Sequence, residues 1–146
     1  MKLYIGCDHR GFDLKEKIKL FYGLNTPPQT FQDIGCKEGE SCDYPEIVAS
    51  LATKMKESDR AVLICGSGVG MSIAANRYDK FRAALCFNRP MADLARRHND
   101  ANILVIGADF IESDLAIDLI EVFLNTEFEG GRHARRLEMI KRGNNG

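Results

Sequence analysis

Short apolar runs alternate with amphipathic stretches along the whole chain, and this alternation constrains the fold more than any other feature of the sequence. The apolar runs have the length and composition of buried strands, whereas the stretches between them repeat their apolar residues with a helical period. Strands that alternate with helices form an open parallel sheet covered on both faces. The pattern therefore predicts an α/β fold, a Rossmann-like three-layer αβα sandwich around a five-stranded parallel sheet.

The same pattern gives each expected element a position. The expected strands are 2–6, 30–34, 60–65, 82–85 and 103–106. The expected helices are 11–22, 44–57, 70–76, 90–98 and 113–124, followed by a basic C-terminal helix over 131–142. We also expect a break at 25–28, where two prolines follow Asn-Thr, and a polar loop over 35–43.

Length and composition fit one domain, residues 1–146, of an ordinary soluble globular protein. Of the 146 residues, 45% are hydrophobic and 28% are charged, and the net charge is −1. This balance argues against a nucleic-acid partner or an anionic membrane surface. The apolar start is too short for a signal peptide and no segment could span a bilayer, so we expect a cytoplasmic protein.

The chain has five cysteines, at positions 7, 36, 42, 65 and 86. An odd number without any C-x-x-C spacing argues against both a disulfide framework and a structural zinc site. We expect four of the cysteines to be small buried residues or bystanders. Cys65 differs because it lies at the bend between a strand and a helix.

That bend has the sequence Cys65-Gly66-Ser67-Gly68-Val69-Gly70 and opens a helix of small residues. Glycines let the backbone turn sharply and let a ligand approach the main-chain N–H groups at the helix start. The sequence predicts an anion-stabilising pocket in which the helix N-terminus lowers the pKa of Cys65. The G-x-G-x-G spacing does not fit a dinucleotide site, and a tight turn that merely needs glycine is the structural alternative.

Asp8 and His9 directly follow the first expected strand. Because the carboxyl ends of parallel strands meet at one edge of the sheet, this loop and the glycine loop should be neighbours. Taken singly, Asp8 could cap the first helix and His9 could be a surface histidine. Together, opposite Cys65, they predict a functional site between the two loops.

Two further groups lie near the C-terminus. His98 closes a helix, where a histidine is favourable for the helix dipole alone. Arg132 and Arg136 are four residues apart and share one helix face. That face could simply be solvated, but the preceding Gly130-Gly131 would let it swing onto an anion, and two arginines bind a phosphate well.

Together these segments resemble the ribose-5-phosphate isomerase type B family, which also includes galactose-6-phosphate and allose-6-phosphate isomerases. The matching segments run in order from residue 6 to residue 136 and cover nearly the whole chain. They are Gly6-Cys7-Asp8-His9-x-Gly11-Phe12, Asp43-Tyr44-Pro45, Ile64 to Asn76 around the glycine loop, Arg82-Ala83, His98-Asn99-Asp100-x-Asn102 and Glu129-Gly130-Gly131-Arg132-His133-x-x-Arg136.

The resemblance implies an aldose–ketose isomerase of the pentose phosphate pathway that needs no metal and no cofactor and interconverts ribose 5-phosphate and ribulose 5-phosphate. Cys65 would move a proton between C2 and C1, and His98 would help to open the furanose ring. Ser67 and the N–H groups of the loop would hold the enediolate. The substrate-binding residues would be Asp8, His9, Tyr44, Gly66, Ser67, Gly68, Val69, Gly70, Asn99, Arg132 and Arg136, with His9 and the two arginines on the phosphate.

Two positions depart from the family pattern. Ser67 stands where many members have threonine, a change that keeps the hydroxyl. Asp109 stands where many members place a further phosphate-contacting arginine. A carboxylate there would repel phosphate unless it turns away or pairs with a nearby arginine, for which Arg135 is the candidate.

The resemblance also implies a homodimer, or a dimer of dimers, with an active site shared between chains. The expected fold leads to the same assembly, because the helix that ends at His98 runs from the carboxyl edge of the sheet to the opposite edge. His98 should therefore lie far from Cys65 of its own chain and reach a substrate in a two-fold-related subunit. A phosphorylated sugar is the expected partner, with no nucleic acid and no membrane.

Three alternatives stay open at this point. The chain could isomerise a hexose 6-phosphate of the allose or galactose type. It could be a non-catalytic phosphosugar-binding module, which would not need Cys65, Ser67 and His98 together. It could also be a Cys–His hydrolase or acyltransferase, which requires a histidine within hydrogen-bond reach of Cys65.

Overall fold

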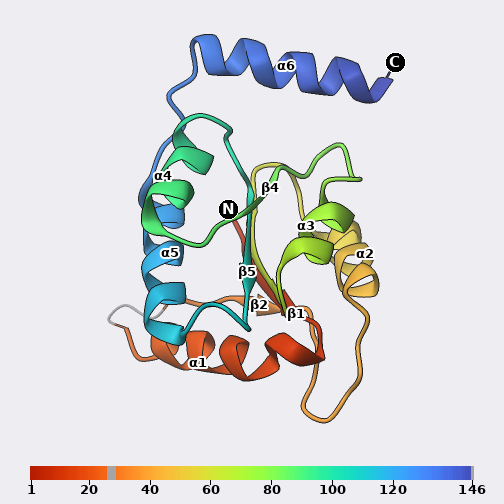
Figure 1. Ribbon diagram of the computed structural model, residues 1–146, viewed down its shortest axis with the longest axis vertical. Coiled ribbons are helices and arrows are strands. Elements are labelled where there is room, and N and C mark those ends of the chain that lie inside the picture. Colours follow the sequence, from red (N-terminus) through yellow and green to blue (C-terminus); the bar gives the residue numbers. More distant parts are fainter. Residues whose placement is uncertain (26–28, 146) are drawn as a thin grey trace.

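Five parallel strands form one sheet within residues 1–25 and 29–145, the part of the chain that the computed structural model describes (Figure 1). Their order in the sheet is β2-β1-β3-β5-β4. The strands are β1 (Leu3–Cys7), β2 (Gln32–Asp33), β3 (Arg60–Cys65), β4 (Ala83–Leu85) and β5 (Ile103–Gly107). The strand order changes direction between β1 and β3, and ligands bind at such a switch point in open α/β sheets.

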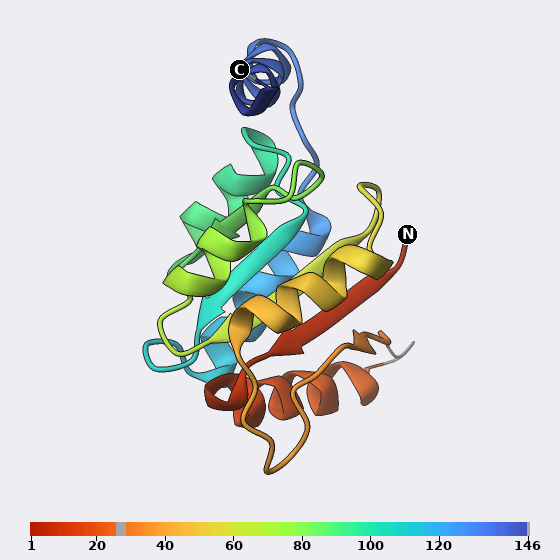
Figure 2. The ribbon, with the colours of Figure 1, turned by 90° about the vertical axis from the view of Figure 1, so that its right-hand side faces the viewer.

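Helices cover both faces of this sheet, as the alternation predicts. They are α1 (Phe12–Gly23), α2 (Tyr44–Lys54), α3 (Val69–Ala75), α4 (Arg89–Arg97), α5 (Ser113–Asn125) and α6 (Arg132–Asn145), with a short 3-10 turn, η1 (His9–Gly11), before α1. Helices α1, α4 and α5 pack on one face, and α2 and α3 pack on the other (Figure 1). Helix α6 crosses the amino edge of the sheet, apart from the layers (Figures 1 and 2).

The central strands are buried on both faces, which explains their continuous apolar sequences. Because side chains alternate along a strand, Ile64 contributes to the core under α1 and α5. Its neighbours Leu63 and Cys65 belong to the opposite core, under α2 and α3. Strand register and alternation thus direct the Cys65 side chain towards the face from which α3 starts.

Most element boundaries lie within one or two residues of the expected ones, and the strand over 60–65 is confirmed at both ends. Strand β2 is shorter than expected, and α2 ends at Lys54 because Met55 adopts an extended conformation. Of the break expected at 25–28, only Asn25 lies within the described residues. Among the described helices, none is both long and apolar enough to cross a membrane.

Candidate active site

The loops after β1 and β3 lie side by side at the carboxyl edge of the sheet, as expected. The amide of Asp8 donates a hydrogen bond to the carbonyl of Ile64, with 3.1 Å between N and O. A Cβ atom at Gly11 would lie 2.7 Å from Cγ2 of Ile64, so a side chain there would force the loops apart. Glycine at position 11 therefore permits the close approach.

The glycine turn places a thiol and a hydroxyl at the start of α3. Gly68 has a φ of +85°, in the left-handed region that glycine adopts without strain. Its amide donates a hydrogen bond to Sγ of Cys65 at 3.2 Å, and the amide of Val69 donates to Oγ of Ser67 at 3.2 Å. Amide donors at a helix start stabilise negative charge, so this turn can hold an anionic oxygen beside the thiol.

Tyr44, the first residue of α2, packs its ring against this turn. A Cβ atom at Gly70 would lie 2.5 Å from Cζ and 2.8 Å from Oη of Tyr44. The absence of a side chain at position 70 thus admits the phenol to the side of the glycine turn. The structure brings Tyr44 together with the predicted loop residues, although they are separated by more than twenty positions in the sequence.

The expectation that the helix N-terminus lowers the pKa of Cys65 is wrong. Burial raises the pKa of the Cys65 thiol, even though hydrogen bonds from the amides of Met71 and Gly68 favour the thiolate. The nearby Asp8 carboxylate raises the pKa further, and Arg10 lowers it. With a side chain only 4% exposed, Cys65 has little water to solvate a negative sulfur, and that cost outweighs the amide donors.

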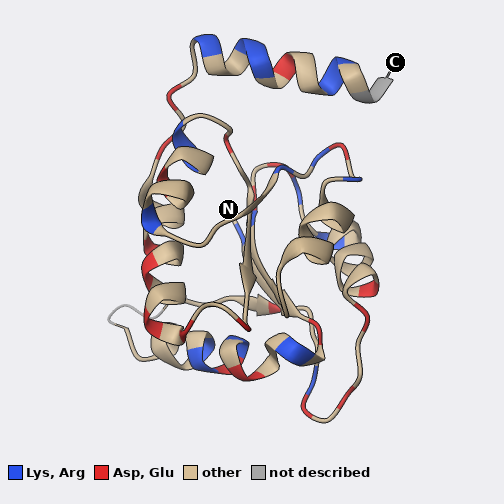
Figure 3. Ribbon diagram, viewed as in Figure 1, with Lys and Arg blue, Asp and Glu red and all other residues tan. Residues whose placement is uncertain are grey.

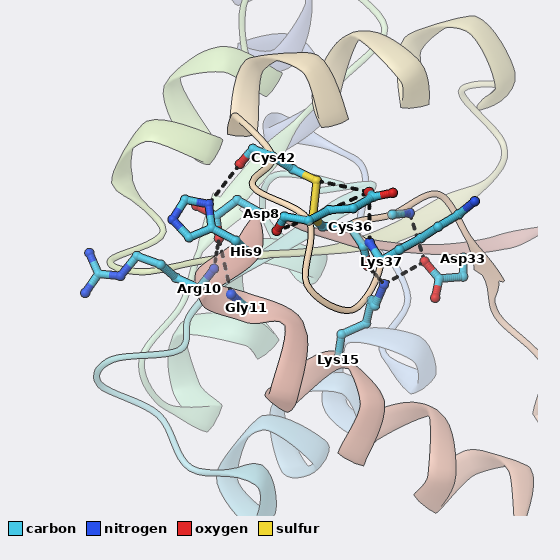
Figure 4. The surroundings of a disulfide bond; sticks show 11 residues. Asp8, His9, Arg10, Gly11, Lys15, Asp33, Cys36, Lys37 and Cys42 are labelled. Carbon is cyan, nitrogen blue, oxygen red and sulfur yellow. Dashed lines mark hydrogen bonds and ion pairs between the residues drawn. A yellow bond between two sulfur atoms is a disulfide. The ribbon is translucent and has the colours of Figure 1, made fainter.

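Asp8 has the capping role that the sequence left open, and it also lies near Cys65. It lies 6% exposed at the end of β1, and its Oδ1 accepts hydrogen bonds from the amides of Arg10 and Gly11 at 3.0 and 3.2 Å. It therefore caps η1 while lying close enough to Cys65 to affect the thiol electrostatically. The neighbouring His9 is exposed, and its Nδ1 lies 3.2 Å from the carbonyl oxygen of Cys42 (Figure 4).

The carbonyl that contacts His9 belongs to a disulfide, which corrects the expectation that no disulfide forms. Cys36 and Cys42 are bonded within the polar loop, with their Cα atoms 6.0 Å apart (Figure 4). The loop reverses direction through Gly39, whose φ is +77°, and this turn brings the two cysteines together. The remaining cysteines, Cys7, Cys65 and Cys86, are free and buried.

Asp109 pairs with Arg10 and not with Arg135, which corrects a second expectation. A carboxylate oxygen of Asp109 accepts a hydrogen bond from Nη2 of Arg10. The amide of Asp109 donates to the carbonyl of Gly66 at 2.9 Å, which ties the loop after β5 to the glycine turn. Arg135 lies instead on α6, where its Nη1 is 3.6 Å from Sδ of Met139.

The other predicted residues lie at the amino edge of the sheet. His98 follows the last residue of α4, and its ring stacks on that of His133 with 4.1 Å between centroids. Nε2 of His98 lies 3.7 Å from a carboxylate oxygen of Glu129. Burial, together with the positive charge of His98 and Arg132, lowers the pKa of His133, which favours a neutral ring at pH 7.

Basic residues recur along the ribbon of α6 (Figure 3). Arg132 and Arg136 lie in its first turns, where both are exposed. Asn99 is exposed as well and lines a cavity of about 620 Å³ between the amino edge and α6. Residues such as Ala134 and Leu137 form the α6 side of this cavity. The amino edge therefore presents its predicted residues to solvent, in contrast to the buried thiol at the other edge.

The two groups are separated by the height of the sheet. Cys65 pairs with Gly107 at the carboxyl end of β5, whereas His98 precedes the start of β5 at Ile103. A strand of five residues spans about 16 Å. This separation confirms the expectation that His98 lies far from Cys65 of its own chain. Among the described residues, the hydrogen-bond donors to Sγ of Cys65 are the backbone amides of Gly68 and Met71, and not a histidine.

The sequence reasoning missed three residues at these sites. Glu129 and His133 join His98 in a group whose candidate ligand atoms lie within 4.8 Å of one another, so their chemistry would suit a metal ion. The match of both residues to the Gly-Gly-Arg-His segment was a signal that could have included them. Arg10 contacts the glycine turn, and the available signal was its place in the loop after the first strand, which was expected to neighbour that turn.

A family model described as Ribose/Galactose Isomerase matches residues 3–140. Curated relatives include the ribose-5-phosphate isomerase B of Escherichia coli, 39% identical over 141 residues that cover 95% of this chain and 93% of the relative. The ribose-5-P isomerase B of Listeria innocua is 38% identical and covers 97% of this chain and 95% of its own length.

Solved structures similar to this chain are also ribose 5-phosphate isomerase B enzymes. Ribose 5-phosphate isomerase B from Thermotoga maritima superposes with a TM-score of 0.85 at 46% identity and covers 97% of each chain. The enzyme from Mycoplasma genitalium, solved with bound ribulose 5-phosphate, superposes with a TM-score of 0.89 at 36% identity. That match covers 99% of this chain and 96% of the other.

Proposed function

The chain belongs to the ribose-5-phosphate isomerase type B family, and from that premise we propose that this isomerase interconverts ribose 5-phosphate and ribulose 5-phosphate. The observation that carries the proposal is the position of the Cys65 thiol, which the amide of Gly68 contacts at the carboxyl end of β3. A base beside amide donors suits removal of a proton next to a carbonyl group, because negative charge then develops on oxygen.

The reaction requires one base and no redox cofactor. The thiolate of Cys65 removes the proton from C2 of the open-chain aldose, the C–H electrons form the C1=C2 double bond, and O1 takes the negative charge. The thiol then returns its proton to C1 while the hydroxyl proton of O2 passes to O1, which leaves the ketone at C2. Ser67 and the amides of residues 66–70 hold the enediolate oxygens.

The remaining proposed residues bind the sugar and its phosphate. Asp8 accepts hydrogen bonds from sugar hydroxyls, and its burial beside the thiol favours this role. Tyr44 borders the same pocket. At the amino edge, His98 assists opening of the furanose ring and Asn99 contacts the substrate. His9, Arg132 and Arg136 bind the phosphate as cationic or hydrogen-bonding donors.

This division of residues leads us to propose a homodimer, or a dimer of such dimers, in which each site takes residues from two chains. A two-fold axis can bring the amino edge of one subunit to the carboxyl edge of its partner. The position of α6 supports this arrangement, because the helix lies beyond the layers of its own chain (Figure 2). Its first two turns carry Arg132 and Arg136.

We further propose that residues 1–146 act as one domain in the cytoplasm, within the pentose phosphate pathway. Free thiols persist in the reducing cytoplasm, which suits Cys65 as a base, whereas the Cys36–Cys42 disulfide would be subject to reduction there. The family description also names galactose, so a hexose 6-phosphate of the galactose or allose type is the second candidate substrate.

The direct test is to incubate the purified protein with ribose 5-phosphate and to measure ribulose 5-phosphate. Parallel assays with galactose 6-phosphate and allose 6-phosphate distinguish the candidate substrates. Turnover of ribose 5-phosphate with the highest kcat/KM is expected. A higher kcat/KM for either hexose phosphate would reassign the substrate, and no turnover of any of the three would refute the proposed reaction.

The same assay tests independence from metal. Activity should survive exhaustive dialysis against a chelator, because proton transfer by Cys65 requires no Lewis acid. The group on which a metal requirement could depend is that of His98, Glu129 and His133, whose ligand atoms could bind a divalent ion. Loss of activity that one divalent metal restores would contradict the proposed mechanism.

A further inference from the structure

Arg10 extends from the loop after β1 onto the glycine turn. A Cβ atom at Gly66 would lie 2.8 Å from both Cζ and Nη1 of Arg10 and 3.0 Å from its Nε. The guanidinium therefore rests on the residue that directly follows Cys65. In Figure 4 the side chain extends away from the disulfide, on the side of η1 that carries His9.

Two backbone contacts and one ion pair hold this guanidinium in place. The amide of Arg10 donates to the buried Asp8 carboxylate at 3.0 Å, which fixes the start of the side chain. Asp109 accepts a hydrogen bond from Nη2, and its own amide is bonded to the carbonyl of Gly66 at 2.9 Å. The loops after β1, β3 and β5 thus meet around one cation.

The position of this cation suits the charged end of a phosphosugar. The side chain of Arg10 is 57% exposed and that of Asp109 is 39% exposed, whereas Cys65 is buried. A sugar whose carbonyl end reaches the thiol keeps its strongly hydrated phosphate at the exposed mouth. A guanidinium has five N–H donors in a planar fork, so it can bind phosphate through one edge while Asp109 holds the other.

We propose that Arg10 is a phosphate-binding residue of the active site and that Asp109 is its positioning residue. This inference rests on the proposed function, because it places the reacting carbon atoms at Cys65. The alternative is an ordinary surface ion pair with no contact to the substrate, and such exposed pairs contribute little to stability. The nearby positive charge of Arg10 also lowers the pKa of the Cys65 thiol, which agrees with its position at the site.

Arg10→Ala should raise KM for ribose 5-phosphate and the Kd for inorganic phosphate by about tenfold each, with kcat changed by less than about threefold, because a charge-assisted hydrogen bond to phosphate is lost. Arg10→Lys should recover part of the affinity. Arg89→Ala is the matched control, since Arg89 forms a comparably exposed ion pair with Asp118 (side chains 61% and 52% exposed). This control should leave both constants unchanged.

The role of Asp109 is tested by whether its removal raises or lowers KM. Asp109→Ala should raise KM while Arg10 is present, because the guanidinium is no longer held. In the Arg10→Ala background the same substitution should lower KM, because the carboxylate there only repels phosphate. A rise in KM on Asp109→Ala in both backgrounds, or no change in KM in either, would contradict a positioning role for Asp109.

The outcomes separate this inference from the proposed function. Unchanged KM and phosphate Kd in a folded Arg10→Ala variant would overturn the phosphate role, as would a fall in kcat alone. A wild-type protein that turns over no sugar phosphate but loses phosphate binding on Arg10→Ala would refute the proposed reaction and leave the anion site standing. Circular dichroism and the thermal midpoint of each variant verify the fold.

Discussion

The two edges of the sheet hold their proposed functional residues in different ways. At the carboxyl edge, Cys65 and Asp8 are buried, and backbone amides contact both side chains. At the amino edge, Asn99, Arg132 and Arg136 are exposed, and α6 crosses apart from the layers (Figures 1 and 2). The comparison teaches that one chain preorganises the proposed proton-transfer half of the site but leaves the other proposed half open to solvent.

Replacement of the proposed base, Cys65, tests the carboxyl edge of the sheet and should have the largest effect on activity. Cys65→Ala should lower kcat by a factor of about 100 to 10,000, because the variant lacks the proposed general base. Affinity for the phosphosugar should stay nearly unchanged, since the phosphate-binding residues remain. Cys86→Ala is the matched control, because Cys86 is another free and buried thiol outside the proposed site. More than about a tenth of wild-type turnover in Cys65→Ala would exclude this residue as the base.

Mixing two inactive variants tests whether the edges meet across a subunit boundary. Cys65→Ala and His98→Ala, unfolded together and reassembled, should recover about a quarter of wild-type activity. Random association makes half of the dimers mixed, and a mixed dimer of shared sites contains one intact site. No recovery, with mixed dimers demonstrated by mass spectrometry, would show that one chain supplies both residues.

Removal of one arginine tests the amino edge, where the proposed phosphate-binding arginines are exposed. Arg136→Ala should raise KM for ribose 5-phosphate by about tenfold and change kcat little, because a charged contact to phosphate is lost. Arg142→Ala, about two turns further along the same helix and also exposed, is the control for the loss of charge alone. Equal effects of the two substitutions would indicate general electrostatic attraction and not a specific contact.

The pH profile tests how burial at the carboxyl edge affects the pKa of the proposed base, Cys65. Since burial raises the pKa of Cys65, the thiolate is the minor form at neutral pH. The value of kcat/KM should therefore rise about tenfold per pH unit from pH 7 to at least about 8.5, the usual pKa of a free thiol. A plateau that begins near pH 7 would mean that the pKa is lowered in the assembled enzyme.

Loss of the Cys36–Cys42 disulfide beside His9 should have the smallest effect on activity. Reduction of Cys36–Cys42, or its replacement by serines, should lower the free energy of unfolding by about 2 kcal/mol, as expected for such a short loop. The activity should change less than in any variant above, because His9 keeps its place at the end of β1. Denaturant titration measures the first effect, and a count of free thiols in the purified protein verifies the bond.

Much of the carboxyl edge could be predicted from the sequence because its residues are close in the chain. The run over 60–65 followed by Gly66, Ser67 and Gly68 is a strand and a turn in any parallel sheet, and the position of Cys65 follows directly. The distance of His98 from Cys65 also follows, because a helix after a parallel strand returns to the opposite edge.

Other features depended on contacts between distant segments. Arg10 and Asp109 are 99 positions apart and meet because β1 and β5 both flank β3. His98 and His133 stack because the segment after α5 returns across the amino edge. Local spacing carries no information on such pairs, so the partner expected for Asp109 was wrong.

The sequence by itself determined the order of strands and helices along the chain, the glycine turn with its thiol, and the opposite edges at which Cys65 and His98 lie. Only the tertiary structure decided the pKa of Cys65, the partner of Asp109 and the pairing of Cys36 with Cys42. The physical reason is that hydrophobic period and backbone preference act over a few residues. Desolvation and charge pairing depend instead on which segments the folded sheet brings into contact.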